Sequence, residues 1–432
     1  MANLTIFGLT QLTSAGADIV NDLVPVWDND VAETKKMTLS DLRNLMYPAN
    51  WSDSFSSATQ ATSSWTPNNA AANVNAAIIP KGTGAITAAI PDGTVTGGNA
   101  RGSYAVDFQM IRNNANQVAS GGASAIVAGQ RNRNESGSAF LGAGTDNRIT
   151  GTAERGFLGA GESNAIDNGG SHVIVGGQSN AIAFASHSFI GGGQSNSTNN
   201  GHNAIAGGRT NALNSQSYQF IGGGQGNTGS GTHSVISGGQ SNTASQSHAV
   251  VSGGQSNTAS AIASTVVGGY NATASLYGQV AHASGRFAAN GDAQAHELIW
   301  RRAITGTAQT ELFLDGASVA AILPGTNSVW NGIIDVSAVC TATGDGSTIV
   351  GHVEATSFKV TIKRIGTTTS LVGTVQEIGT TNADASMATA VFTIDNNDTN
   401  ESLRVLFTPP GTAGSTTVIR AIATFRGQQI QY

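Results

Sequence analysis

Acidic side chains are the first residues to consider for chemistry, because cleavage of a glycosidic bond usually needs two carboxylates that flank the bond. The sequence has neither Asp nor Glu between Asn168 and Asn290. The acids just before this stretch fall at different points of a repeat, so no stacked pair is evident, and those of the C-terminal third lie mostly in or beside turn sequences. The first group is Glu135, Asp146, Glu154, Glu162 and Asp167, and the second is Asp315, Asp335, Asp345, Glu354, Glu377 and Asp384. For the first group, solvation at the protein surface is the favoured interpretation. A catalytic pair in the second group stays open, although nothing in the sequence points to one. We therefore predict no catalytic residues and expect that the chain is not an enzyme.

Histidines form the second pattern. Six of the eight lie in a repetitive region, and four of them stand three positions before the second residue of an apolar pair: His187, His202, His233 and His248. Tyr218 takes the same position in the intervening repeat. Stacked repeats would align these rings along one corner, where imidazoles can bind a metal or an anion. Carboxylate partners and His-x-His pairs are missing from the sequence, so we interpret the ladder as a duplicated polar corner and predict no metal site.

Other chemical signatures are missing from the sequence. The single cysteine, Cys340, excludes an intramolecular disulfide and is expected to be a small buried hydrophobe. The GGGQSN-like segments lack the Gly-Lys-Ser/Thr of a phosphate loop, so no cofactor is predicted. A net charge of -6 without a basic stripe argues against nucleic-acid binding. No apolar run approaches the ~18 residues of a membrane span, and the N-terminus lacks the basic region of a secretory signal.

One pattern recurs ten times between residues 101 and 290: two β-favouring apolar residues, a Gly-rich corner, a short polar linker and an Asn. The terminal asparagines recur every 14 to 17 residues: Asn132, Asn147, Asn164, Asn180, Asn196, Asn211, Asn227, Asn242, Asn257 and Asn271. Paired apolar residues followed by Gly doublets do not fit an amphipathic helix, and Gly-Gly suits tight corners with positive φ. The pattern predicts a parallel β-solenoid of about ten coils, with the Asn side chains stacked as a ladder along the axis.

Such a coil is too small to be stable alone. Two large buried side chains contribute ~3–6 kcal/mol, whereas ordering a coil costs on the order of 20 kcal/mol. Backbone ladders between coils supply much of the difference, and a second chain on an apolar face would add more. We therefore expect a homo-oligomer, and a homotrimer suits a thin rod best.

The sequences on either side of the repeats predict two further parts of an all-β chain. Residues 1–47 are expected to form a small mixed module, with a strand at 23–27, a turn at 28–36 and a short strand leading into a helix at 37–47, N-capped by Ser40. Residues 48–100 are expected to be a linker and lead-in segment, which at 48–77 is either a linker or an extended strand exchanged between subunits. Residues 291–432 predict an antiparallel β-sandwich. Its apolar runs are at 293–316, 320–324, 328–340, 357–365, 370–378, 387–395, 401–407 and 417–425.

Several segments carry a family resemblance. The GG-x-N repeats look like the left-handed β-roll heads of trimeric adhesins. IIPKGTGAI at 78–86, GGNARGSYAVDFQ at 97–109 and QVASG at 117–121 resemble the segment that leads into such repeats in many bacteriophage fibre proteins. LVPVWDNDVAETKKMTLSDL at 23–42 resembles the N-terminal segment with which phage fibres dock to the virion. The sequence shows no coiled-coil stalk or membrane barrel of the bacterial adhesins, which favours the phage resemblance.

The resemblance implies a homotrimeric, tail-fibre-like virion appendage, made in the host cytoplasm without a signal peptide. Its N-terminal module would bind a virion tail or adaptor protein, with candidate contacts at Asp28, Asp30, Glu33, Lys35 and Lys36. The solenoid would be a stiff spacer. The C-terminal domain would form the tip and contact a host-surface glycan or protein, with candidate loops at Asp345–Thr348 and Asn396–Asn400 and no receptor-binding residue assigned. Two alternatives stay open: a purely structural virion component, such as a whisker or adaptor, and, less favoured, a polysaccharide depolymerase.

Overall fold

The computed structural model describes residues 23–28, 33–38, 51–55, 63–67 and 78–432, and all regular structure in these residues is β. The chain divides into two compact units, Met1–Ile79 and Pro80–Tyr432. In the first unit, β1 (Leu23–Asp28) pairs antiparallel with β2 (Glu33–Thr38), and β3 (Trp51–Phe55) pairs antiparallel with β4 (Ser63–Pro67). Across the described residues, no helix has the length and apolar character needed to cross a membrane.

The first unit differs from the sequence expectation in two places. The expected turn at 28–36 is too long, because Asp28 ends β1 and 33–36 lie in β2, where they pair with β1. The charges of Glu33, Lys35 and Lys36 favoured a turn, but a short two-stranded sheet tolerates charged residues on its edges. Within 48–77, where a linker or an exchanged strand was expected, the structure has the antiparallel β3–β4 pair. The helix expected after Ser40 falls outside the described residues.

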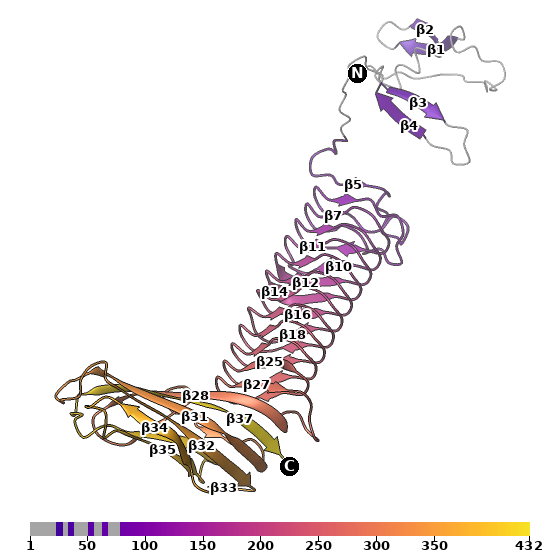
Figure 1. Cartoon of the computed structure of the whole chain (residues 1–432). Helices are drawn as coiled ribbons and strands as arrows, with labels where there is room; N and C mark the ends of the chain where they lie inside the picture. Colours follow the sequence, from indigo (N-terminus) through magenta and orange to yellow (C-terminus); the bar gives the residue numbers. More distant parts are fainter. Residues whose placement is uncertain (1–22, 29–32, 39–50, 56–62, 68–77) are drawn as a thin grey trace. The chain divides into compact units, whose positions relative to one another are not determined.

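The second unit begins with a parallel β-solenoid of about 12 turns, drawn between β5 and β27 in Figure 1. From β7 to β26 each coil contributes one short strand to each of two parallel sheets, and the coils of β5, β6 and β27 contribute to the first sheet only. The first sheet contains β5 (Ile86–Thr87), β6 (Val106–Asp107), β7 (Ala125–Ile126), β9 (Phe140–Leu141), β11 (Phe157–Leu158), β13 (Val173–Ile174), β15 (Phe189–Ile190), β17 (Ala204–Ile205), β19 (Phe220–Ile221), β21 (Val235–Ile236), β23 (Val250–Val251), β25 (Thr265–Gly269) and β27 (Val280–Ala283). The second contains β8 (Arg133–Asn134), β10 (Arg148–Thr150), β12 (Ala165–Gly170), β14 (Ala181–Ser186), β16 (Ser197–Asn199), β18 (Ala212–Leu213), β20 (Thr228–Gly229), β22 (Thr243–Ala244), β24 (Thr258–Ala259) and β26 (Thr273–Ala274).

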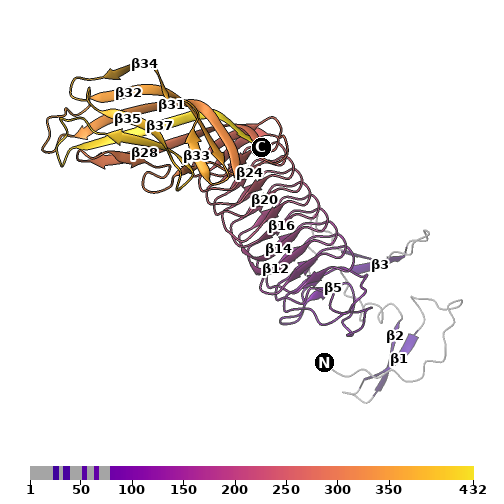
Figure 2. The same ribbon diagram turned by 90° about the horizontal axis from the view of Figure 1, so that it is seen from below.

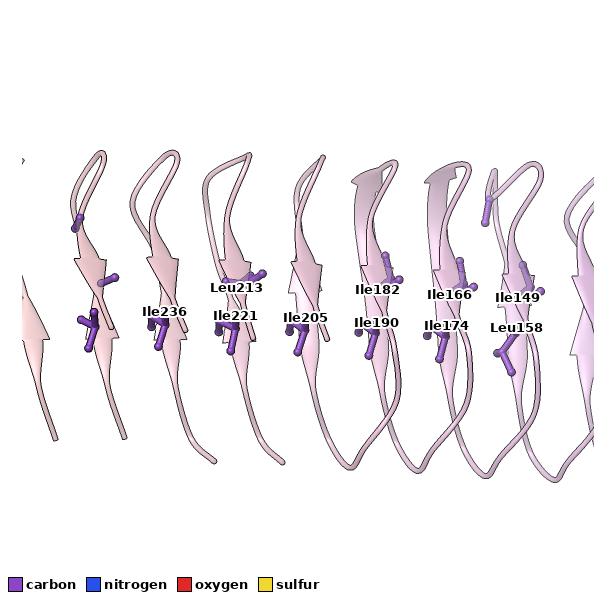
Figure 3. Close-up of a cluster of buried hydrophobic side chains, with 14 of the residues drawn as sticks. Ile149, Leu158, Ile166, Ile174, Ile182, Ile190, Ile205, Leu213, Ile221 and Ile236 are labelled. Atoms are coloured by element: carbon purple, nitrogen blue, oxygen red, sulfur yellow. The ribbon is translucent and has the colours of Figure 1, made fainter. Parts of the chain in front are cut away.

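A continuous apolar column fills the space between the two sheets. The second residue of each apolar pair points inward and is fully buried from Ile126 to Val266. Figure 3 shows the middle of this column, where Ile182 of the second sheet lies beside Ile190 of the first. Towards the C-terminal coils the inward residues of the second sheet shrink to alanine, at Ala244, Ala259 and Ala274. The second residue of each apolar pair therefore forms the core, whereas the first points outward, so the pair buries one large side chain per coil and not the expected two.

The asparagine ladder follows the prediction over nine coils, from Asn132 to Asn257, all fully buried. The Oδ1 atom of each Asn accepts the backbone N–H of the corresponding residue in the next coil, at 2.9–3.0 Å. The prediction is wrong at the tenth position. There the N–H of Ala272, and not that of Asn271, donates to Asn257 Oδ1. Asn271 occupies the preceding corner with a φ of 65°. The ladder ends in the coil that contains β26, which is the last strand of the second sheet.

The two ends of the solenoid are closed differently. At the start, Asp107 occupies an inward position and forms buried ion pairs with Arg101 at 2.8 Å and Arg112 at 3.4 Å, in place of an apolar side chain. At the other end, β28 (Ala293–Thr305) pairs antiparallel with β27, so the first sheet continues without a break into the C-terminal domain. Here the His296 ring packs edge-on against Trp330 and Phe425, and burial lowers its pKa to about 3, so this imidazole is neutral.

The C-terminal domain consists of two antiparallel sheets that share one apolar core. One sheet has the order β28, β37 (Val418–Gln431), β31 (Asn327–Ala342) and β32 (Val353–Ile365), and Figure 2 shows these strands side by side; β33 (Thr368–Leu371) and β34 (Gln376–Ala383) both pair with β32. The other contains β29 (Thr310–Leu312), β30 (Ala321–Ile322), β35 (Val391–Asn397) and β36 (Ser402–Thr408). The run expected at 370–378 is thus divided between β33 and β34, with Gly373 between them at a φ of 76°.

Candidate binding surfaces

The solenoid has one apolar outer face, which we call the phenylalanine face. It is formed by the first residue of each apolar pair in the first sheet: Phe140, Phe157, Val173, Phe189, Ala204, Phe220, Val235 and Val250. The four phenylalanines are each about 40% exposed (39–41%). The outward residues of the second sheet are instead small or polar, ending in Thr228, Thr243, Thr258 and Thr273. The solenoid is therefore amphipathic across its width, which marks the phenylalanine face as an interaction surface.

The same surface continues onto the C-terminal domain. Val280 pairs with Glu297 across β27 and β28, so the outward residues of β28, β37 and β31 extend the outer face of the first sheet. Close to the solenoid the charges on this surface are paired internally. Arg426 lies 3.1 Å from Glu297 and 3.4 Å from Asp335. This part of the surface therefore has little free charge.

A pocket of 470 Å³ lies further along the same strands. Its walls and floor come from β28, β37 and β31 and from the turn after Phe313; the lining includes Arg301, Ala303, Asp315, Val339, Arg420 and Ile422. Ala303 pairs with Arg420, and Arg301 with Ile422, so the two arginines are diagonal neighbours on one face of the sheet. The volume is within the range of small-molecule sites.

The two loops proposed from the sequence use their polar groups internally. The Asp345 carboxylate accepts hydrogen bonds from the Ser415 and Thr416 side chains, at 2.6 and 2.8 Å, and from the Thr416 N–H. These bonds, that of Ser415 first, hold its pKa well below the usual range. In the other loop, Asn397 Oδ1 accepts two backbone N–H groups and Asp398 accepts the Thr369 N–H. The loops lie near opposite ends of β32 and do not form one site.

Two carboxylates expected beside turns lie together on neighbouring strands. Glu354 is on β32, paired with Ala338 of the core, and is only 3% exposed. Its Oε2 atom is buried without a hydrogen-bond partner among the described residues. Burial and, second, the charge of Glu377 on β34 raise the pKa of Glu354 to about 7. Glu377 accepts hydrogen bonds from Thr381 and Thr356, which lower its own pKa.

The Glu354→Gln variant should be more stable than the parent chain above neutral pH, where the parent loses stability. The ordinary pKa of this carboxyl is 4.5 and its folded-state pKa is about 7, so the folded chain holds a proton that the unfolded chain releases. The stabilisation is complete below pH 4.5 and falls as the pH rises to 7, by about 3 kcal/mol at most. We expect Glu354→Gln to match the parent chain at pH 4 and to exceed it at pH 8 in urea unfolding, followed by the fluorescence of the core residues Trp300 and Trp330.

The exposed neighbour supplies the control. Glu377→Gln removes the smaller of the two causes of the raised pKa, so it should reduce the pH dependence only in part. A Glu354→Gln variant whose stability differs from the parent by the same amount at both pH values would contradict the assignment.

The ring ladder forms as predicted but does not gather metal ligands. His187, His202, Tyr218, His233 and His248 stack with centroid distances of 4.8–5.2 Å. All five have positive φ and are exposed, so they occupy one corner of successive coils. Within the part of the chain that the structure describes, no group of three or more His, Cys, Asp or Glu side chains is placed to hold a metal ion.

Comparisons with known proteins find similarity only among solved structures; no family model matches, and no curated protein matches. The tailspike protein of Acinetobacter phage vB_ApiP_P1 is 10% identical and is similar over 77% of this chain and 79% of its own, with a TM-score of 0.19. Tailspike gp49 of the Acinetobacter baumannii phage Fri1, described as a capsular polysaccharide depolymerase, is 9% identical over 88% and 76%, with a TM-score of 0.18. The tailspike of Acinetobacter baumannii phage AM24 is 8% identical over 80% and 78%, with a TM-score of 0.20.

The expectation that the chain is not an enzyme is wrong as an exclusion, because a described depolymerase is among the similar structures. The C-terminal carboxylates were expected mostly in or beside turns, whereas Glu354 lies within β32, is buried, and is affected by the charge of Glu377. Glu354 pairs with Ala383 and Glu377 with Phe358, so the pairing of β32 with β34 brings the Glu377 charge near enough to act on Glu354. The sequence contains no signal for that register.

The arginine pocket was also missed. The alternating pattern at 293–305 does place Arg301 on the outward face of its strand. Its neighbour Arg420, however, is on β37, the last strand of the chain, and only the register of β28 with β37 places it beside Arg301.

Proposed function

We propose that this chain is a phage tail appendage, of the tail-fibre or tailspike kind, that attaches the virion to its host. The one-sided solenoid carries this proposal: a long stack of coils with one apolar outer face suits a shaft assembled from several copies. The N-terminal unit binds a virion tail or adaptor protein, the solenoid acts as a spacer, and the C-terminal domain, an antiparallel β-sandwich, contacts a host-surface glycan or protein. In this role the protein is located in the virion.

The homotrimer is part of the proposal, with the phenylalanine face turned towards the three-fold axis. Four exposed phenylalanines along one face are unfavourable in water, and three copies packed on this face bury them against one another. The small and polar outward residues of the second sheet then face water. Trimerisation also gives the tip three sites that act together, which raises avidity without new contacts.

Phe220→Lys should dissociate the assembly. Phe220 is 41% exposed, and a charge there would be brought to the axis in all three copies, at the loss of about 1.5–3 kcal/mol of apolar burial per chain. Light scattering at micromolar concentration should give three chains for the parent and one for the variant. Thr243→Lys, on the outward side of the second sheet, is the matched control and should stay trimeric. A monomeric parent protein would contradict the trimer.

Attachment is tested with the full chain on cells of the bacterial host. Labelled protein should bind saturably, and excess unlabelled protein should block adsorption of phage particles. Saturable binding without any effect on adsorption would contradict the attachment role. Failure to bind cells, together with capture by another virion protein, would instead support a purely structural component such as a whisker or adaptor.

A second candidate function, cleavage of a surface polysaccharide, is favoured by one observation. Burial and the charge of Glu377 raise the pKa of Glu354 to about 7, whereas hydrogen bonds lower the pKa of Glu377, so the two carboxyls differ in the direction that a glycosidase acid and its carboxylate partner need. Incubation of the full chain with purified host polysaccharide should then release reducing ends, and Glu354→Gln should abolish the release. Unchanged release by this variant would place any cleavage elsewhere.

A further inference from the structure

The pocket between Arg301 and Arg420 carries an unbalanced positive charge. Three arginines, Arg301, Arg302 and Arg420, contribute to its lining together with a single carboxylate, Asp315, and the side chains of Arg301 and Arg420 are on the outward face of the sheet. That carboxylate is already engaged: its Oδ1 atom accepts the N–H groups of Ala317, Ser318 and Val319 at 2.8–2.9 Å. The bond from Val319 is the largest cause that lowers its pKa to about 2. Asp315 is therefore used by its own turn and remains ionised without pairing with the arginines.

The three arginines differ in how far they are committed. Arg301 donates to the carbonyls of Leu314 and Asp315, and so fixes the wall of the pocket. Arg302 donates to the Glu311 carbonyl and lies over the Phe313 ring. Among the described residues, Arg420 forms no ion pair or side-chain hydrogen bond, and it is exposed. The Arg420 guanidinium is therefore free to bind a ligand, and the Arg301 guanidinium holds the wall of the same pocket.

A second copy of the chain is a poor occupant for this end of the surface. In the proposed trimer this surface continues the face turned towards the three-fold axis, around which the same residues of the three copies meet, so unpaired arginines would face arginines. Towards the solenoid the situation is different, because Arg426 is already neutralised by Glu297 and Asp335. The charge therefore favours an anionic ligand at the distal pocket and a second copy along the phenylalanine face.

We propose that the pocket binds an acidic saccharide, with the sugar carboxylate held by the Arg420 guanidinium beside Arg301 and the sugar ring placed over the apolar floor of Ala303, Val339 and Ile422. A guanidinium matches a carboxylate through two parallel N–H···O bonds. The pocket volume of 470 Å³ accommodates a ligand of this size. This inference rests on the proposed attachment function and names the class of glycan that the tip would bind.

The test uses the full chain and two matched probes, an oligogalacturonate of defined length and its methyl ester, which lacks the charge. Isothermal titration should detect the acid and give at least about tenfold weaker binding for the ester. Arg420→Gln should reduce the affinity for the acid by a similar factor. Lys359→Gln removes the same charge from β32 of the same domain and should have no effect. Should Arg420→Gln fail to fold, Arg420→Lys keeps the charge without the fork and should still weaken binding several-fold.

Three results would overturn the proposal: equal affinity for acid and ester, unchanged affinity in Arg420→Gln, or no binding of either probe. The last result, combined with loss of the trimer in Arg420→Gln, would assign the pocket to contact between copies. Failure of this proposal is distinguishable from failure of the attachment function. Saturable, adsorption-blocking cell binding that Arg420→Gln leaves unchanged would retain attachment and remove only the acidic saccharide.

Discussion

Asn227→Ala should destabilise the solenoid by several kcal/mol, far more than an alanine at an exposed asparagine. The Asn227 side chain is fully buried, and its Nδ2 atom donates to the carbonyls of Gly223 and Gly239, each at 2.9 Å. Its Oδ1 atom accepts the Asn242 N–H at 2.9 Å. Alanine removes all three bonds and leaves buried backbone groups without these partners, at about 1–3 kcal/mol each.

Unfolding of the full chain, followed by circular dichroism in denaturant, measures the effect. Asn214→Ala is the matched control, because Asn214 is in a neighbouring coil, is half-buried and forms no side-chain hydrogen bond among the described residues. Asn227→Asp keeps the shape and loses both donors, so it should be at least as damaging as alanine. Equal stability of the Asn227→Ala and Asn214→Ala variants would mean that the ladder only fills space.

The second large effect is expected from one glycine of a doublet and not from the other. Gly208 has a φ of +94°, and a Cβ there would lie 2.2 Å from the Gly224 carbonyl oxygen and 2.6 Å from Asn211 Nδ2. Gly208→Ala would therefore separate two coils and displace a ladder side chain. Gly207 has ordinary backbone geometry, and a Cβ there meets nothing within 4 Å.

The two alanine variants should differ sharply when unfolded under the same conditions. Gly207→Ala should unfold at the parent midpoint or slightly above it, because alanine restricts the unfolded chain. Gly208→Ala should lose several kcal/mol, combining about 1–3 kcal/mol of backbone strain with the contact to the next coil. Comparable midpoints for the two variants would show that the coils can move apart at little cost.

The repeat made the solenoid, its core column and its asparagine ladder predictable, because each coil repeats the same residue types at the same places. The second strand of each coil was not foreseen, since its inward position varies from Ile182 to Gly229 and Ala259 and therefore carries no apolar signal. The coil of β5 was assigned to the lead-in segment, whereas β6 lies inside the predicted roll of 101–290 but departs from its repeat. β5 and β6 belong to the first sheet, but the inward residue of β6 is Asp107, which is stabilised by Arg101 and Arg112 and has no counterpart in the repeat.

The candidate sites could not be obtained from the sequence because they depend on strand register. The pocket joins Arg301 to Arg420, and the carboxylate pair joins Glu354 to Glu377. Both pairs are created by antiparallel neighbours whose offset is set by the packing of the whole domain. An alternating pattern predicts which side of a strand a residue is on. It does not predict which residue of the neighbouring strand lies beside it. Turn sequences led attention to loops such as Asp345–Thr348, whose polar groups are satisfied within the fold.

Because every coil pairs only with the coil before and the coil after it, the length of this shaft is free to change. Duplication of one repeat would insert a coil whose two faces match those of its neighbours, so neither the capped start nor the β27–β28 junction would have to adapt. Each such event would move the C-terminal domain outward by one strand spacing, about 4.8 Å. The length of the solenoid can therefore change by one coil at a time, without any change to the residues at its two ends.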